Sequence, residues 1–308
     1  MLKKIFCNIC GGETTAIQVK EQMLGLNERF IYYSCTNCGH THLNDIPESI
    51  GKYYNTNNYY SFKKPSANSR IISTCKKILL KFNLVDNIFF SRSMKAFLKT
   101  KRAQENLKIL DYGCGSGYFV DELHSLGFKQ AMGFDPFLPA NKFNEKGIYL
   151  SNDIELLGEK KWDLLTLNHV FEHLTDPIQT LKNLNELLNP KGLLILRFPV
   201  IDSYAFEKYK ENWVQFDAPR HLNIFTRKSI KIAVEKATGF KNVNIYDDSF
   251  HFQFTGSDLY IKNLSLSSAN NNRRKRLLSF SSYKYHFLAK KLNRLNKGDQ
   301  IVVVLEKK

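Results

Sequence analysis

The chain has 308 residues, of which 43% are hydrophobic and 24% charged, which is typical of a soluble globular protein with one large and one smaller domain. The composition excludes a membrane-spanning protein, because Arg197 and Pro199 interrupt the apolar run Gly192–Ile201. It also argues against a secretory signal, since no apolar stretch follows the two lysines at the N-terminus. We therefore expect a cytoplasmic protein.

The formal net charge of +16 is concentrated in two segments. Residues 59–102 contain eleven Lys or Arg and one acid, and residues 262–297 contain ten Lys or Arg and no acid, so the rest of the chain is slightly acidic. Such local patches indicate a specific anionic partner. Three interpretations stay open: peripheral contact with the anionic inner face of a membrane, nucleic acid, which the acidic core disfavours, and two solvated helices that cover a pocket.

Four of the six cysteines form two matched pairs, Cys7 with Cys10 and Cys35 with Cys38, and a glycine follows each pair. In such turns both thiolates point to one side, and four thiolates suit a closed, structural zinc site. A redox dithiol is the alternative. We expect residues 1–50 to form a zinc-ribbon-like module. Its folding energy should come from the metal, because little apolar sequence surrounds the cysteines.

Residues 51–105 are predicted to form a basic helical linker or cap. Apolar residues recur at helical spacing within Arg70–Leu84, with lysines between them, and a second basic helix is expected at Ile88–Lys99.

From Leu107 onward, short apolar strands alternate with helices, which predicts a parallel sheet with helices on both faces. Residues 106–308 should therefore form a Rossmann-like, doubly wound α/β domain with a mostly parallel, seven-stranded sheet. A basic helical insertion at residues 262–297 interrupts it. Six of the strands are expected at 107–113, 131–135, 162–170, 192–198, 241–248 and 299–308, and the expected helices are 118–127, 177–188 and 226–239.

A glycine-rich turn is the strongest signal in this domain. A hydrophobic strand reaches Asp111, and glycines follow at positions 113, 115 and 117 before a helix begins. Glycines permit a tight strand-to-helix turn and let a ligand lie against the backbone. A dinucleotide site requires G-x-G-x-x-G, but Tyr118 or Val120 occupies the place of the third glycine. The spacing therefore disfavours a dinucleotide.

The same spacing resembles motif I of the class I S-adenosylmethionine-dependent methyltransferases, and the resemblance extends from about Leu107 to the C-terminus. It implies S-adenosylmethionine as the cofactor. It also implies that a carboxylate after the second strand, here Asp135, accepts hydrogen bonds from both ribose hydroxyls, and that Asp153 lies beside the adenine. The cofactor-binding residues expected on this basis are Asp111, Gly113, Gly115, Gly117, Asp135, Pro136, Asp153, Ile154 and Asn168.

The sequence after the fourth strand, NHVFEHLTDP, resembles the H-V-x-E-H-x-x-D-P region of small-molecule and sugar methyltransferases. Methyl transfer from a sulfonium needs positioning and a base for the acceptor's proton, and histidine has a suitable pKa. His169 and His173 are candidate bases beside Glu172. Two alternatives stay open: Glu172 and His173 brace the loop, or all three residues bind a divalent cation. Similar quinone methyltransferases carry glutamate in place of His169 for that purpose, so histidine here disfavours a hard cation.

A further histidine, His221, lies within NWVQFDAPRHLNIFT, which resembles the acceptor-pocket segment W…D-x-P-R-H-L-x-x-F of the same family. The resemblance implies that Trp213 lines the acceptor pocket, that Arg220 holds an anionic group, and that His221 binds the acceptor or acts as the base. The alternative is a structural loop, fixed by Pro219 and packed by Trp213 and Phe225.

A zinc module ahead of such a core resembles methyltransferases of bacterial sugar and surface-polysaccharide pathways. We therefore expect a methyltransferase that O-methylates a sugar or glycan, linked to a nucleotide or lipid diphosphate. C-methylation of a nucleotide sugar is less favoured, because the chain lacks the long C-terminal domain of those enzymes. RNA methylation is a further alternative. A non-catalytic scaffold is another, although the intact glycines, Asp111 and Asp135 argue against it.

Overall fold

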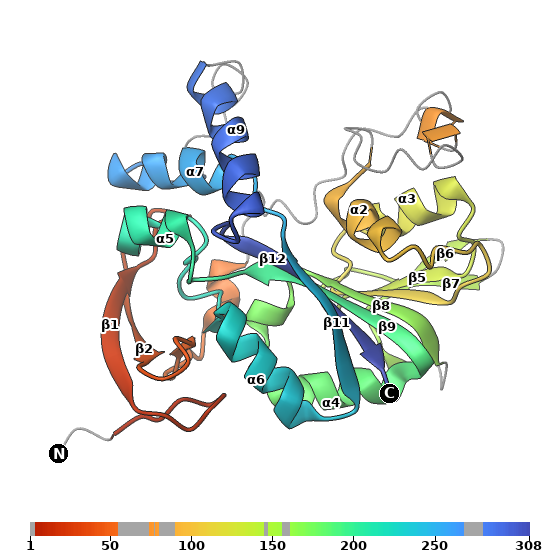
Figure 1. The fold of residues 1–308 in the computed structure, drawn as a ribbon, viewed down its shortest axis with the longest axis horizontal. Helices are drawn as coiled ribbons and strands as arrows, with labels where there is room; N and C mark the ends of the chain where they lie inside the picture. Colours follow the sequence, from red (N-terminus) through yellow and green to blue (C-terminus); the bar gives the residue numbers. More distant parts are fainter. Residues whose placement is uncertain are drawn as a thin grey trace.

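The computed structural model describes residues 4–54, 74–76, 78–79, 90–144, 147–155, 161–267 and 280–308. Most of the amphipathic helix expected within Arg70–Leu84 lies outside these residues, as does the middle of the predicted basic insertion, residues 268–279. The described residues form one eight-stranded sheet and one four-stranded sheet, with helices around them (Figure 1).

The eight-stranded sheet has the order β11-β12-β9-β8-β4-β5-β7-β6. Six strands point the same way, and only β12 and β6 run opposite to their neighbours. This confirms the predicted doubly wound, mostly parallel α/β fold. The sheet has one strand more than predicted, because the short β6 pairs with β7 at the sheet edge. The strands are β4 (Ile109–Tyr112), β5 (Ala131–Phe134), β6 (Lys142–Asn144), β7 (Gly147–Ser151), β8 (Trp162–Asn168), β9 (Leu188–Pro199), β11 (Phe240–Asp247) and β12 (Gln300–Lys307).

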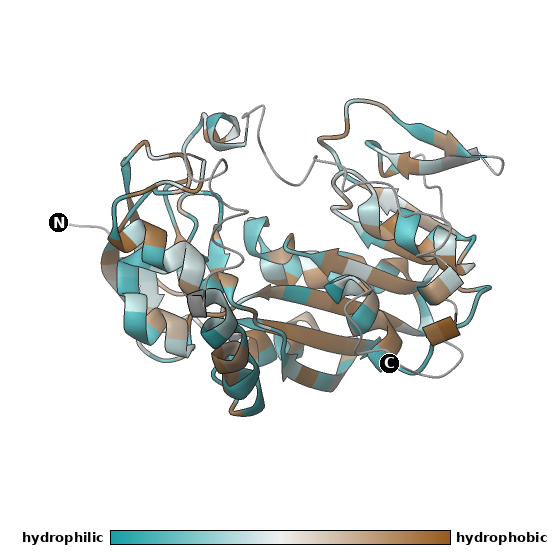
Figure 2. Cartoon of the chain, turned by 90° about the horizontal axis from the view of Figure 1, so that it is seen from above, coloured by the Kyte–Doolittle hydropathy of each residue, from teal (hydrophilic) through white to brown (hydrophobic). Residues whose placement is uncertain are grey.

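Helices cover both faces of this sheet (Figure 1). One face carries α2 (Arg92–Lys99) and α3 (Tyr118–Leu126), and the other carries α4 (Pro177–Leu187) and α6 (Arg227–Ala237). A strand covered on both faces must be apolar throughout, and the second half of β9 is buried at every position. Figure 2 shows the central strands as predominantly hydrophobic ribbons. The carboxyl ends of these strands form the edge that carries the candidate site.

The N-terminal cysteine region forms the smaller sheet, with β1 (Thr14–Lys20), β2 (Arg29–Cys35), β3 (Thr41–Leu43) and β10 (Asn223–Ile224). All of its pairs are antiparallel. Strand β10 comes from the large domain, so the predicted module shares a sheet with that domain. The cysteines also belong to the same hydrophobic cluster as Phe225 and residues of β8 and β9. The expectation that metal alone supplies the folding energy of this region is therefore corrected, because packing against the core contributes as well.

Three further helices lie beside the smaller sheet, α5 (Tyr204–Tyr209), α7 (Phe252–Ile261) and α9 (Phe280–Arg294) (Figure 1). Helix α9 occupies part of the predicted basic insertion. The hydroxyls of Tyr209 and Tyr285 both donate to the carboxylate of Asp258, at 2.7 and 2.8 Å, which ties the three helices together. Among the described residues, no helix combines the length and apolar character needed to cross a membrane.

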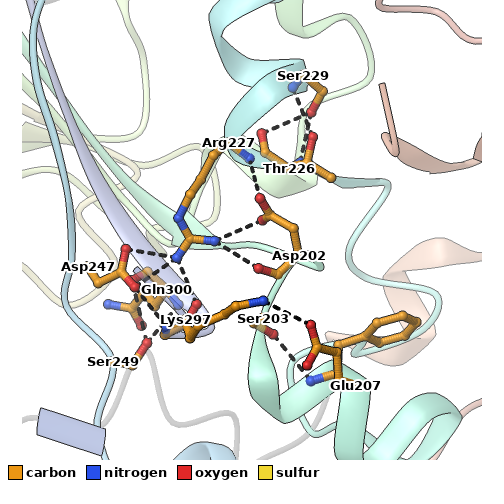
Figure 3. A network of polar contacts seen from close by, with 12 residues as sticks. Asp202, Ser203, Glu207, Thr226, Arg227, Ser229, Asp247, Ser249, Lys297 and Gln300 are labelled. Carbon is orange, nitrogen blue, oxygen red and sulfur yellow. Dashed lines mark hydrogen bonds and ion pairs between the residues drawn. The ribbon is translucent and has the colours of Figure 1, made fainter. Parts of the chain in front are cut away.

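A polar network fixes the start of α6 (Figure 3). The guanidinium of Arg227 donates to Asp202 at 3.0 Å and to Asp247 at 2.8 Å, so it joins the loop after β9 to the end of β11. The side chain of Thr226 caps the helix in a reciprocal capping box. The segment before α6, which carries His221, is thereby anchored at its end.

Candidate cofactor site and histidine cluster

The glycine-rich turn connects β4 to α3. Gly113, Gly115 and Gly117 have φ values of 78°, 54° and 86°, a conformation that favours glycine. A Cβ on Gly113 would approach Val170 Cγ2 to 2.3 Å, and one on Gly117 would approach Leu150 Cδ1 to 2.4 Å. The turn therefore needs glycine for both conformation and space. It leaves backbone at the N-terminus of α3 available to a nucleoside ligand, which fits the expected cofactor.

Asp135 follows β5 and joins this turn. Its Oδ2 accepts a hydrogen bond from the backbone N–H of Gly115 at 2.8 Å, and its Oδ1 accepts one from that of Phe137 at 2.9 Å. The carboxylate is 8% exposed. It therefore lies beside the glycines, and its expected contact with the ribose hydroxyls stays a prediction.

Asp111, the acidic residue of β4, is 3% exposed. Its Oδ1 accepts hydrogen bonds from Thr166 Oγ1 at 2.6 Å and from Asn168 Nδ2 at 3.2 Å. Burial raises the pKa of this carboxyl to about 7, against the opposing effect of the two hydrogen bonds. Asp111 and Asn168, two predicted cofactor residues from neighbouring strands, are thus in direct contact.

The remaining predicted cofactor residues lie on the surface. Pro136, Asp153 and Ile154 are exposed, and Asp153 Oδ1 accepts a hydrogen bond from the backbone of Glu155 at 2.9 Å. Strand β7, which precedes Asp153, pairs with β5, so Asp153 lies at the same sheet edge as Asp135. Its proposed place beside the adenine stays a prediction.

A cluster of histidines surrounds Glu172 in the short 3₁₀ helix η4 (Phe171–His173) after β8. Glu172 is fully buried, and neither of its carboxylate oxygens has a hydrogen-bond partner. His169 Nδ1 lies 3.3 Å from Glu172 Oε1, and His221 Nε2 lies 3.8 Å from the same oxygen. The rings of His173 and His221 are 4.8 Å apart. All three predicted candidate bases therefore meet at one carboxylate.

The protonation of this cluster follows from its contacts. Burial raises the pKa of Glu172, but the contact with His169 and the charges of the other two histidines lower it to about 2. Burial lowers the pKa of both His169 and His173. At neutral pH, Glu172 is therefore a carboxylate and these two imidazoles are uncharged.

Trp213 and Arg220, both predicted to contact the acceptor, are buried and bonded to other parts of the protein instead. Trp213 is fully buried, and its Nε1 donates to Asp299 at 3.1 Å. Arg220 is also fully buried; it pairs with Asp217 and donates from Nη1 to the backbone oxygen of Tyr53 at 3.0 Å. Neither side chain is presented to an acceptor in this structure, which favours the structural-loop alternative for both.

Two aromatic residues that the sequence did not single out lie at the cluster. The ring of Tyr54 stacks on Phe137 at 6.0 Å, and its hydroxyl lies 3.1 Å from His173 Nδ1. Phe137 is 68% exposed. Tyr54 lies in a tyrosine- and asparagine-rich stretch without periodicity, so no sequence signal distinguished it from its neighbours.

The four paired cysteines form a second cluster, with all four sulfurs within 4.8 Å of one another. Cys7 and Cys38 lie 3.6 Å apart, Cys10 and Cys35 lie 3.4 Å apart, and all four are unpaired thiols. The glycines after the two pairs, Gly11 and Gly39, both have positive φ, as the sharp turns require. Four converging thiols of this kind fit a tetrahedral zinc ion.

A doubly wound sheet with a glycine-rich turn after β4, a carboxylate in β4 and another after β5 fits the class of Rossmann-like, S-adenosylmethionine-dependent methyltransferases. The model of a family described as "Methyltransferase domain" matches residues 88–245, just over half of the chain. The chain belongs to this family, and it is an S-adenosylmethionine-dependent methyltransferase.

Curated relatives match over shorter regions. The tRNA U34 carboxymethyltransferase of Nautilia profundicola is 32% identical over 133 residues, which cover 38% of this chain and 44% of that one. The tRNA U34 carboxymethyltransferase of Aliarcobacter butzleri is 30% identical over 153 residues, which cover 46% of this chain and 50% of that one. The chain therefore spans about half the length of these relatives. Among solved structures, an S-adenosylmethionine-dependent methyltransferase from Mesorhizobium loti matches 70% of this chain and 99% of its own with a TM-score of 0.43 at 15% identity.

Proposed function

We propose that this enzyme transfers a methyl group to a hydroxyl oxygen of a sugar or glycan, and that Glu172, His173 and His221 activate that hydroxyl. The observation that carries the proposal is the meeting of these three side chains, whose ligand atoms lie within 4.8 Å of one another at the carboxyl edge of the sheet. Ligands of open α/β sheets bind at this edge. Val170, next to the cluster, is the side chain that a Cβ on Gly113 would strike, so the cluster adjoins the glycine turn.

The residues that we expect to bind the cofactor lie at the same carboxyl edge of the sheet. Gly113, Gly115 and Gly117 would lie against the cofactor, with Asp135 and Pro136 at the ribose, Asp153 and Ile154 at the adenine, and Asp111 with Asn168 at the amino-acid end. When bound, S-adenosylmethionine supplies a methyl group activated by its sulfonium. The protein's own part is to align the acceptor and to remove its proton.

The orientation of two imidazoles supports the activating role. His173 Nδ1 lies 2.8 Å from the carbonyl oxygen of Arg220, and His221 Nδ1 lies 2.8 Å from that of Gln215. A carbonyl only accepts, so each Nδ1 carries the hydrogen and each Nε2 presents a lone pair. Such a lone pair can take a proton or bind a cation. His169, predicted as a base, has its Nδ1 toward Glu172, and we assign it the role of orienting that carboxylate.

The surroundings of the cluster support a sugar as the acceptor. The stacked rings of Tyr54 and Phe137 offer an aromatic surface next to His173, and aromatic rings pack well against the apolar faces of sugars. Arg220, whose backbone carbonyl contacts His173, has its side chain already paired with Asp217, so a neutral acceptor group fits better than an anionic one. A bacterial surface-polysaccharide pathway, with a nucleotide- or lipid-diphosphate-linked glycan, would provide such an acceptor at the inner face of the membrane.

The names of the relatives support a second candidate, tRNA. Helix α9 presents exposed Tyr283 and Phe287 together with exposed Lys290 and Arg294, spaced along one helical face. Aromatic and basic side chains that alternate in this way suit single-stranded nucleic acid, which combines bases for stacking with anionic phosphates. The same face would also suit an anionic membrane surface.

A structural zinc ion at Cys7, Cys10, Cys35 and Cys38 completes the proposal. Backbone N–H groups of Cys10 and Cys38 point to Cys7 Sγ and Cys35 Sγ at 3.5 Å, which stabilises thiolates that bind a metal. Four protein ligands leave no position for water, so this ion would have no part in catalysis.

A methyl-transfer screen with labelled S-adenosylmethionine tests the function, with nucleotide sugars, lipid-linked glycans and tRNA as acceptors. We expect label in a glycan, and mass spectrometry would then locate it on an oxygen. His173→Ala and His221→Ala should each lower turnover more than about tenfold without loss of affinity for S-adenosylhomocysteine, since a general base contributes at least about a hundredfold. His124→Gln, a half-buried histidine on α3, is the control. Label in tRNA alone would replace the glycan proposal with the second candidate.

A further inference from the structure

The histidine cluster places three hydrogen-bond acceptors together without donors between them. With each Nδ1–H committed to a backbone carbonyl, His173 and His221 present only Nε2 lone pairs. Glu172 adds a fully buried carboxylate: its Oε1 has His169 Nδ1 at 3.3 Å, and its Oε2 has no hydrogen-bond partner. One uncharged imidazole does not offset the cost of burying a whole negative charge. This arrangement therefore needs a positive group at its centre.

A protonated His221 does not meet this need. His221 Nε2 is 3.8 Å from Glu172 Oε1, beyond the range of a hydrogen bond, so a proton on this nitrogen would not bridge the two atoms. The same nitrogen is 3.8 Å from Asp217 Oδ2, but that carboxylate already pairs with Arg220. A spacing of this size between ligand atoms suits two groups that share one metal ion, each at roughly 2 Å from it.

We propose that Glu172, His173 and His221 form an open binding site for one divalent transition-metal cation. Two imidazoles and one carboxylate are the ligands that zinc and ferrous iron take in sites with free coordination positions. Both histidines already have the outer contacts typical of metal ligands, because a backbone carbonyl holds each Nδ1–H and thereby fixes the ring.

His169 and Gln300 would form the outer shell on the carboxylate side. His169 Nδ1 lies 3.3 Å from Glu172 Oε1. With the amide of Gln300 oriented so that its oxygen faces Arg197, its nitrogen lies 3.2 Å from His169 Nε2. The hydrogen of His169 is then on Nδ1, toward Glu172. This chain would hold the carboxylate in place beside His173 and His221, where the cation would lie.

The metal site would also explain how the acceptor is activated. This part of the proposal rests on the proposed function, because it takes the acceptor hydroxyl as a further ligand of the cation. A cation lowers the pKa of a bound hydroxyl, so that its proton passes to water. The oxygen then forms its bond to the methyl carbon as the carbon–sulfur bond breaks, and S-adenosylhomocysteine leaves. The cation would thus replace a separate catalytic base.

Titration of the purified full-length protein with Co²⁺ tests the site, after zinc has saturated the cysteines. Cobalt bound to nitrogen and oxygen gives visible d–d bands, whereas cobalt bound to thiolate adds strong charge-transfer bands. We expect one further equivalent of Co²⁺ without thiolate bands, and an X-ray absorption spectrum with imidazole scattering and no sulfur. Glu172→Gln and His221→Ala should each weaken this binding more than about tenfold, because loss of even an outer partner costs at least that much.

The control is His124→Gln, whose imidazole contacts the backbone oxygen of Ala131 and no acid. It should bind Co²⁺ as the native protein does, and unchanged affinity for S-adenosylhomocysteine would show that each variant is folded. Absence of the extra equivalent, or equal Co²⁺ affinity in Glu172→Gln, His221→Ala and the native protein, would overturn the proposal. If turnover survives metal removal while His221→Ala is inactive, the metal site would be excluded, but the proposed function would stand.

Discussion

The cysteine cluster and the histidine cluster differ in how many possible metal ligands they offer and in how far apart those residues lie in the sequence. The cysteine cluster brings together four sulfurs from two short turns, and three of its members are buried. The histidine cluster brings together three side chains, of which His173 is half-buried and the other two are buried, from segments about 48 residues apart. Four ligands close a coordination sphere, whereas three leave room for a substrate atom. We therefore expect the first cluster to contribute stability and the second to take part in the chemistry.

Arg220 links the two regions. Its guanidinium pairs with Asp217 beside the histidines and reaches the backbone of Tyr53 and, at 3.7 Å, the carboxylate of Glu21 in the cysteine region. Burial raises the pKa of Asp217, but the positive charge of Arg220 lowers it to about 2. The N-terminal region thus supports the loop that carries His221, in addition to offering the proposed zinc site.

The largest expected effect comes from breaking the closed cluster. Cys35→Ser removes one of four ligands, and zinc at a thousandfold excess over its dissociation constant contributes about 4 kcal/mol. We therefore expect zinc loss and a fall in unfolding free energy of that order, measured by urea denaturation with parallel metal analysis. Cys75→Ser, at an exposed thiol outside the cluster, should change neither. Full zinc content and native stability in Cys35→Ser would show that the cluster is not a metal site.

Arg220→Gln separates the two roles considered for this residue. It leaves the buried carboxylate of Asp217 without its partner, which should lower the unfolding free energy by about 3 kcal/mol. Lys52→Gln, at the more exposed ion pair with Glu28, should cost less than about 1 kcal/mol. Urea denaturation measures both. A raised KM for the acceptor in a variant of native stability would instead restore the predicted acceptor contact of Arg220.

The cysteine cluster and the fold could be predicted from the sequence better than the histidine cluster could. Cys-x-x-Cys and the glycine turn are local motifs, and strand–helix alternation determines most of a parallel sheet. The histidine cluster depends on a tertiary contact. Helical spacing grouped His169 with Glu172 and His173, and the structure places His169 Nδ1 3.3 Å from Glu172. The approach of His221 to the same carboxylate was not predictable, because it comes from a distant part of the sequence. Pairing of β10 with β3 was not predictable, because a strand of two residues has no periodicity.

The cofactor end of the site should respond to pH. Burial raises the pKa of Asp111 to about 7, so this carboxyl is partly protonated near neutrality. A cationic cofactor favours the ionised form, so binding below the pKa must first release a proton. Affinity for S-adenosylmethionine should therefore rise about tenfold from about pH 6 to about pH 8 and then level off. Calorimetric titration across this range measures it. Asp111→Asn should abolish the slope, and a flat profile in the native protein would contradict the assignment.

The smallest expected effect concerns Tyr54, which lies between the N-terminal region and the histidine cluster. Tyr54→Phe keeps the ring that stacks on Phe137 but removes the hydroxyl 3.1 Å from His173 Nδ1 and 3.4 Å from the carbonyl of Arg220. A hydrogen bond of this kind contributes about 1 kcal/mol, so turnover should fall about fivefold with KM nearly unchanged. Tyr54→Leu also removes the aromatic surface and should raise KM for a sugar acceptor. Steady-state kinetics of both variants would separate the two contributions, and equal KM values would remove the ring from the acceptor site. Because Tyr54 follows directly on the N-terminal region, such a split would make that region part of the active site as well as its support.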